Sequence, residues 1–187
     1  MVAHFDYYVN KGDAENARGV LLIPRFTCGS SKMKDTNDTT GAYAATIVHT
    51  TTCPAIASAL STVLGSYLLS NRLFLSNTIN ANTASMAGAG YIGASTNCTW
   101  AASQCELPNE IQIFGSTVAS SSFYDVGLEC EKLAVFNFIS HVEYGRSGFW
   151  LRSVAGSTNF ALAHYGGYAI SVGAGNLSGL CPLIYIG

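Results

Sequence analysis

Three long stretches of this chain, residues 39–71, 73–105 and 153–187, contain no Asp, Glu, Lys or Arg. Ser, Thr, Asn or Gly interrupts each stretch every few residues, so none offers the roughly 20 consecutive apolar residues of a membrane-spanning helix. Over the whole chain, 9 basic and 11 acidic residues give a net charge of −2. A chain with so little charge has no field that attracts a polyanion, and we expect neither membrane insertion nor nucleic-acid binding.

The clearest helical pattern lies in the first half of the chain. Six apolar residues fall on one face of a helix expected at about 54–70: Ile56, Leu60, Val63, Leu64, Tyr67 and Leu68. We expect this face to pack against the C-terminal strands. Thr52 is positioned to cap the helix, and Pro54 suits its first turn. Residues 41–50 predict a shorter helix before it, and residues 128–139 another after it.

Strand patterns dominate the C-terminal half. Short apolar or alternating runs bounded by Gly, Ser, Asn or Pro predict strands at 19–23, 72–75, 110–114, 149–152, 160–163, 168–172 and 181–186. Residues 76–105 are rich in Asn, Ala, Ser and Gly and predict a long irregular excursion. Helices followed by a strand-rich half favour an α+β fold over βαβ repeats.

No enzymatic motif has the context that its chemistry needs. The segment 88–93 matches G-x-G-x-x-G, but neither a strand before it nor a good helix after it is predicted, so we do not expect nucleotide binding. None of the four histidines has a second His or a carboxylate at ligand spacing, and His49 is expected on the surface or as a satisfied core residue. We therefore predict no catalytic residue, no metal and no cofactor.

The six cysteines form no C-x-x-C pair. Cys98 and Cys105 are close enough in the sequence to bridge a loop. For the other four, small buried hydrophobic side chains are the simpler interpretation.

The last 37 residues differ from the rest of the chain in composition. They contain no Lys, Glu, Gln, Met or Trp, whereas these five types make up 17 of the first 150 residues. The five types are those that a codon ending in C cannot encode. A hypervariable cassette built on AAC codons would leave this mark, and so would a neutral, strand-rich segment with little use for long polar side chains.

A Trp-Leu-Arg-Ser sequence stands at 150–153, and spaced glycines and alanines follow it up to Gly-Leu-Cys-Pro-Leu-Ile at 179–184. This pattern resembles the WLRS-box domain family of gut bacteriophages and prophages. Residues 109–115 and 71–76 resemble that family's second and third boxes, so the resemblance runs from about residue 40 to the end. Cys181 stands where the family has an arginine, and any ion pair of that arginine is absent here.

The resemblance implies a C-type-lectin-like fold, with two helices followed by the strand-rich half, over residues 41–187. Residues 1–40 would form an N-terminal arm with the first strand. Some members of the family are variable proteins of diversity-generating retroelements, which mutate adenines in a C-terminal cassette to vary a binding surface. The positions implied for display are His164, Tyr165, Gly166, Tyr168, Ile170, Ser171, Val172 and Gly173.

The resemblance also implies a function. The chain would be a virion surface protein on a head or tail fibre, made in the bacterial cytoplasm, that adheres to a bacterial surface receptor of protein or glycan. Other virion proteins would be partners, and a homo-oligomer, a trimer by analogy with fibres, is expected. The alternative is a purely structural capsid or tail decoration subunit, in which the same segment packs against a neighbour.

The composition of residues 164–176 suits a binding surface without reference to the family. Tyr and His present large rigid areas, whereas Ser, Gly and Asn, including Asn176, adapt to a partner. We expect Tyr165 and Tyr168 to be the anchors. If 168–172 is extended, then Tyr168, Ile170 and Val172 share one face and form an exposed apolar patch.

Arg152 is the only formal charge after Arg146. It lies among uncharged predicted strands, so we expect it to be buried and paired with a carboxylate. Glu110 is the candidate partner, and Glu143 is nearer in the sequence.

Overall fold

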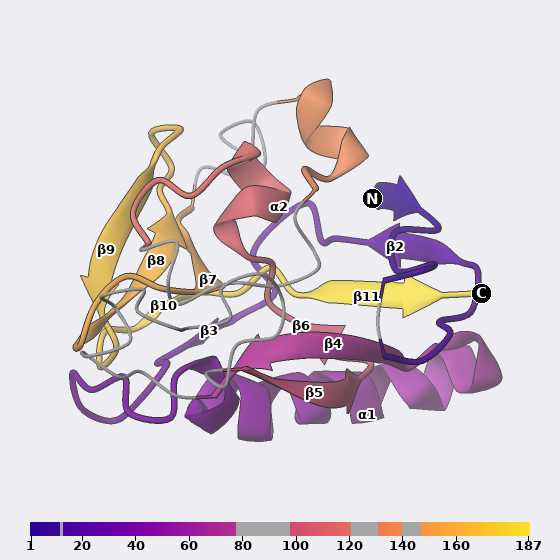
Figure 1. Ribbon diagram of the computed structural model, residues 1–187, viewed down its shortest axis with the longest axis horizontal. Helices are drawn as coiled ribbons and strands as arrows, with labels where there is room; N and C mark the ends of the chain where they lie inside the picture. Colours follow the sequence, from indigo (N-terminus) through magenta and orange to yellow (C-terminus); the bar gives the residue numbers. More distant parts are fainter. Residues whose placement is uncertain (12, 78–97, 121–130, 140–146) are drawn as a thin grey trace.

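The computed structural model describes residues 1–11, 13–77, 98–120, 131–139 and 147–187 (Figure 1). In these ranges the chain has an α+β architecture, with one principal helix and three β-sheets. The G-x-G-x-x-G match at 88–93 lies outside the described residues.

The first sheet joins the two ends of the chain. Its order is β1 (Val2–Phe5), β2 (Val20–Leu22), β11 (Leu183–Ile186) and β6 (Cys105–Glu106), with all neighbours antiparallel. Figure 1 shows the N- and C-termini on the same side of the molecule. The strand predicted at 19–23 is confirmed as β2. Its Leu21, with Tyr7 and Met33, belongs to the same hydrophobic core as Trp150 and Tyr185.

The second sheet contains most of the C-terminal half. Its order is β3 (Ser30–Ser31), β10 (Ser178–Gly179), β7 (Phe149–Val154), β8 (Asn159–Ala163) and β9 (Ala169–Gly173). All six residues of β7 are buried. Trp150 is fully buried, and its indole N–H donates a 2.8 Å hydrogen bond to the carbonyl oxygen of Ser31. The four strands predicted after residue 148 are therefore confirmed, with β9 and β11 beginning one and two residues later than expected.

The third sheet pairs β4 (Asn71–Ser76) with β5 (Cys98–Ser103) in antiparallel register. β4 confirms the strand predicted at 72–75. β5 and β6 correct the expectation of an irregular segment through residue 105. Ala101, Ala102 and Ser103 carry little strand propensity of their own. Their pairing with β4 determines the strand, and no local sequence pattern reports it.

The principal helix is α1 (Cys53–Leu64), which lies along the lower edge of the molecule in Figure 1. It continues directly from a π-helical segment, η2 (Val48–Thr52), which follows the short 3₁₀ turn η1 (Tyr43–Ala45). Together these two segments replace the single short helix expected at 41–50. Thr52 is itself helical and gives no side-chain cap, so that prediction is wrong, whereas Pro54 does lie in the first turn.

The buried face of α1 matches the predicted one in part, since Ile56, Leu60 and Leu64 are half-buried and pack against the core. Ala57 is buried, whereas Val63 is 83% exposed and Tyr67 is 68% exposed. The α-helix ends at Leu64, where Gly65 has a positive φ of 55°, and a 3₁₀ turn, η3 (Gly65–Tyr67), follows. The 3.6-residue period therefore stops before Tyr67. Among the strands, α1 makes its main contacts with β6, and not with the C-terminal strands against which it was expected to pack.

Residues 110–114 form a helix, α2 (Glu110–Phe114), and the strand predicted there is wrong. Asn109 caps it through a capping box. Its side-chain oxygen accepts the backbone N–H of Gln112 at 2.8 Å, and the Gln112 side chain accepts the backbone N–H of Asn109 at 2.8 Å. Gly115 ends the helix with a φ of 86°. The helix predicted at 128–139 is represented among the described residues by a 3₁₀ segment, η5 (Ala134–Asn137).

Candidate functional site

The β8–β9 hairpin ends in a five-residue loop, residues 164–168, that carries three aromatic rings. The backbone N–H of His164 donates to the carbonyl of Tyr168 at 2.8 Å, and the N–H of Gly167 donates to the carbonyl of His164 at 3.0 Å. These hydrogen bonds close the turn directly above a five-pair antiparallel register. The side chains at the tip are therefore mounted on a rigid support.

His164 lies at the centre of the aromatic cluster at this tip. Its ring centroid is 3.9 Å from that of Tyr165 and 4.5 Å from that of Tyr168, and its plane is inclined by 36° and 29° to theirs. Tyr165 is 59% exposed and Tyr168 is 51% exposed. The cluster of His164, Tyr165 and Tyr168, hereafter the tip cluster, presents aromatic surface to solvent, as the sequence predicted for the two tyrosines.

Gly166 is required by the packing of the tip cluster. A Cβ at this position would lie 2.8 Å from Cε1 of Tyr168 and 3.1 Å from Nδ1 of His164. The backbone N–H of Gly166 also donates to Nδ1 of His164 at 3.0 Å, so this nitrogen is the acceptor and the proton of the neutral ring lies on Nε2. Gly167 adopts a positive φ of 94°, which a side chain would disfavour.

The remaining candidate residues do not form one face with the tip cluster. Ile170 and Val172 are half-buried and pack against the core, which corrects the predicted exposed patch of Tyr168, Ile170 and Val172. Tyr168 precedes β9, so the alternation of the strand does not extend to it. Ser171 is exposed and its hydroxyl lies 2.8 Å from the side-chain nitrogen of Asn159.

Gly173 and Asn176 lie at the other end of β9. A Cβ at Gly173 would lie 2.5 Å from Oδ1 of Asn37, which accepts the backbone N–H of Gly175 at 2.9 Å. Asn176 is exposed in the turn that follows. The candidate residues therefore divide into a tip group and a distal group, and Gly173 has little room for a side chain.

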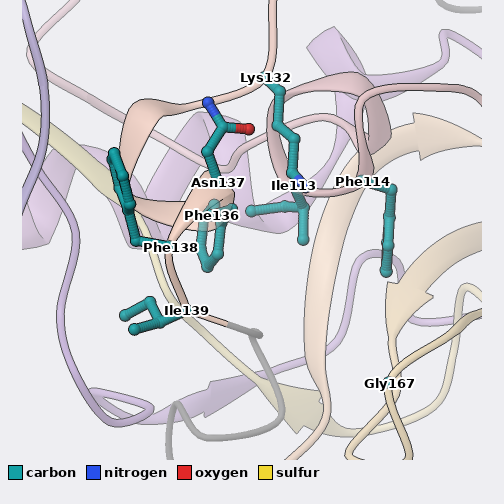
Figure 2. Close-up of a pocket in the computed structure, with 8 residues that line it drawn as sticks. All are labelled: Ile113, Phe114, Lys132, Phe136, Asn137, Phe138, Ile139 and Gly167. Carbon is teal, nitrogen blue, oxygen red and sulfur yellow. The ribbon is translucent and has the colours of Figure 1, made fainter.

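A cavity of about 370 Å³ opens beside the hairpin turn (Figure 2). Its walls come from the end of α2, from the residues around η5 and from the turn itself: Ile113, Phe114, Lys132, Phe136, Asn137, Phe138, Ile139 and Gly167. Gly167 belongs to both the hairpin turn and the cavity wall. Sequence analysis missed this cavity because its walls come from three segments that no local pattern connects.

Glu106, His49 and Tyr43 form a polar network inside the molecule. One oxygen of the buried Glu106 carboxylate lies 2.7 Å from Nδ1 of His49, and the other accepts the Tyr43 hydroxyl at 2.6 Å. The hydrogen bond to Glu106 raises the pKa of His49 despite its partial burial, while Arg152 nearby acts in the opposite direction. Burial and the Glu106 charge raise the pKa of Tyr43 well above 10. The expectation that His49 is a satisfied residue is confirmed.

Arg152 is buried, as predicted, and its backbone N–H donates to the carbonyl of Pro108 at 2.9 Å. Glu110 is also buried, but the carboxylate of Glu110 accepts hydrogen bonds from the Val118–Ser120 segment and none from Arg152. Its donors are the three backbone N–H groups of that segment and the hydroxyl of Ser120. These bonds fasten the chain after α2 to the helix. The direct Glu110–Arg152 pair is not formed between these described residues.

None of the cysteines in the described ranges forms a disulfide with another of them: Cys28, Cys53, Cys98, Cys105 and Cys181. The bridge considered between Cys98 and Cys105 is therefore not formed. Cys53 and Cys181 are buried, as expected, whereas Cys28 is exposed. Burial raises the pKa of Cys181 to about 12, so its thiol stays protonated at neutral pH.

Within the ranges that the structure describes, no three or more His, Cys, Asp or Glu residues gather in a way that could hold a metal ion. No helix in those ranges has the length and apolarity needed to cross a membrane. Comparisons with protein-family models, curated proteins and solved structures find no match to this chain.

Proposed function

We propose that this chain is a binding protein on the surface of a bacteriophage particle, and that it adheres to its bacterial host through the tip cluster. The observation that carries the proposal is the geometry of the cluster. Two tyrosines, each more than half exposed, stack on a central His164 at the end of a rigid hairpin. Exposed rigid aromatic side chains are typical anchors of binding surfaces, because they offer large contact area at a low cost in conformational entropy.

The surroundings of the cluster support a recognition role. The segment from Ser153 to the end carries no charged side chain. Removing water from its surface on binding therefore costs less free energy than removing water from a charged surface. The resemblance to the WLRS-box family, whose members resemble C-type-lectin-like variable proteins, supports the same function. The α+β architecture is compatible with a fold of that class. The receptor would be a protein or a glycan, and the particle would carry several copies of the chain, with a trimer as the working model.

The structural alternative, a capsid or tail decoration subunit, is favoured by a different surface. An apolar groove of about 350 Å³ runs between β1 and η5, and its residues include the exposed Met1, Val2, Phe5 and Phe138. Exposed apolar surface of this kind often marks contacts between subunits. This groove is separate from the tyrosines of the tip cluster, so the two functions can be tested independently.

The test is adsorption of the purified, fluorescently labelled protein to a panel of gut bacterial strains, measured by flow cytometry. We expect the wild-type chain to bind at least one strain, and the double variant Tyr165→Ala/Tyr168→Ala to lose at least about tenfold in affinity, because such anchors dominate binding free energy. Tyr67→Ala is the matched control, since Tyr67 is a comparably exposed tyrosine outside the tip cluster. Equal binding by wild type and double variant, or no binding by wild type to any strain, would overturn the proposal.

A further inference from the structure

The cavity beside the hairpin turn has one charged wall. Lys132 is the only Asp, Glu, Lys or Arg among the described residues that line it. The Lys132 stem packs over Gly115 at the end of α2, where its Cδ lies 3.4 Å from the position that a Cβ on residue 115 would occupy. Figure 2 shows the side chain extending between Asn137 and Phe114. The ammonium group is therefore held at the cavity by the packing of its own aliphatic stem.

Among the residues that the structure describes, no carboxylate pairs with Lys132. Its sequence neighbour Glu131 is paired instead with Lys11 at 2.8 Å and with His4 at 3.7 Å. Lys132 as a residue is half-buried, and a charge beside apolar walls attracts an anion more strongly than a charge in open solvent.

The other walls offer surfaces for a ring-shaped ligand. Phe114, Phe136 and Phe138 contribute aromatic rings, and Phe138 is 87% exposed. Asn137 adds a carboxamide that can donate and accept hydrogen bonds. The C–H face of a sugar ring can lie on an aromatic ring while its hydroxyls reach polar groups at the rim. A cavity of about 370 Å³ is within the range of small-ligand sites.

We propose that this cavity is a subsite for a hexuronate residue of an acidic glycan, with the sugar carboxylate on Lys132 and the sugar ring against the phenylalanines. This inference rests on the proposed function, because Gly167 links the cavity to the tip cluster and one glycan chain would contact both. It names the receptor class as an acidic polysaccharide. An acidic protein segment is the competing ligand.

The experiment is a calorimetric titration of the whole chain with oligogalacturonate and oligomannuronate, each compared with its methyl ester. The ester retains the ring and removes the charge. We expect at least one free acid to bind, and its ester to bind at least about tenfold more weakly. Lys132→Gln should bind the free acid about tenfold more weakly than the wild-type chain does, and its affinity for the ester should be unchanged. Lys132→Arg should retain most of the affinity for the acid. Lys32→Gln is the matched control, since it removes the same charge from an exposed lysine elsewhere.

Equal affinity for acid and ester, or equal losses in Lys132→Gln and Lys32→Gln, would overturn the subsite. The subsite is also refuted if neither uronate binds, or if a poly-glutamate peptide binds through Lys132 where the uronates do not. None of these outcomes refutes the proposed function if the double variant Tyr165→Ala/Tyr168→Ala adsorbs to cells more weakly than the wild-type chain. Unchanged adsorption in that double variant would refute the proposed function, whatever the titration gives.

Discussion

The imidazole of His164 stacks on the phenol of Tyr168, with 4.5 Å between ring centroids and 29° between ring planes. The contact joins the residue that follows β8 to the residue that precedes β9. It fixes the orientation of Tyr168, whose ring would otherwise rotate freely at the tip. A preorganised aromatic ring loses less entropy on binding than a mobile one.

Gly166→Ala should disturb this stack without unfolding the protein. The new Cβ would lie 2.8 Å from Cε1 of Tyr168, so the ring must move. We expect the upfield ring-current shifts of His164 and Tyr168 in proton NMR to diminish and adsorption to cells to fall about tenfold. The unfolding free energy should change by no more than about 0.5 kcal/mol, because the site is exposed. Gly156→Ala, at a turn with open space around the added methyl, should change none of these.

The His49–Glu106 pair predicts a pH-dependent stability. The pKa of His49 is raised above 6.5 in the folded chain, chiefly by its hydrogen bond to Glu106. The stabilisation is therefore fully present below about pH 6.5 and is lost as the pH rises through the raised pKa. His49→Gln should lower the unfolding free energy by about 3 kcal/mol near pH 6. Urea unfolding from about pH 5.5 to 9 should show this difference shrinking, and a constant difference would contradict the assignment.

The buried face of α1 can be tested by enlarging a buried side chain and by truncating an exposed and a half-buried one. Ala57→Leu should destabilise the protein by about 1–3 kcal/mol, because a larger side chain overpacks a buried position. Val63→Ala should cost less than about 0.5 kcal/mol, since Val63 is on the surface. Leu64→Ala, at a half-buried position, should cost about 1–2 kcal/mol. Chemical denaturation of the three variants checks the order, and a larger loss for Val63→Ala than for Ala57→Leu would show that Val63, and not Ala57, faces the core.

The capping box of α2 predicts a cost for Asn109→Ala. The Gln112 backbone N–H loses its acceptor, Oδ1 of Asn109, and the Gln112 side chain is no longer held against the backbone N–H of residue 109. The unfolding free energy should therefore fall by about 1–2 kcal/mol. Asn109→Ser should recover part of this loss, because a serine hydroxyl can accept the same N–H. If the serine variant is no more stable than the alanine variant, the cap is not the reason that residue 109 matters.

The strands with strong local patterns were predictable from the sequence, whereas the element at 110–114 was not. Glu-Ile-Gln-Ile-Phe alternates as a strand does, and five residues are too few to distinguish a strand from a helix by period. The signal that distinguishes the helix lies just before it, in Asn109 followed three residues later by Gln112, which is a capping-box signature. The alternation at 110–114 hides this signal. β5 was missed for another reason, since Cys98–Ser103 depends on long-range pairing with β4.

The candidate site was predictable only at its tip. Tyr165 and Tyr168 flank two glycines between alternating apolar residues, and this pattern identifies an exposed turn. The orientation of Ile170 depends on which side of the sheet faces the core, and that is a tertiary property. Lys132 and Gly167 are 35 positions apart, and only the fold brings them to one cavity.

The most direct measurement of the central claim is tyrosine footprinting on protein bound to host cells. Tetranitromethane nitrates exposed tyrosines, and mass spectrometry gives the extent at each residue with and without cells. If the tip cluster is the binding surface, Tyr165 and Tyr168 become protected on binding, whereas Tyr67, which is exposed elsewhere, is nitrated as before. Protection of Tyr67 with unchanged nitration of Tyr165 and Tyr168 would contradict the account.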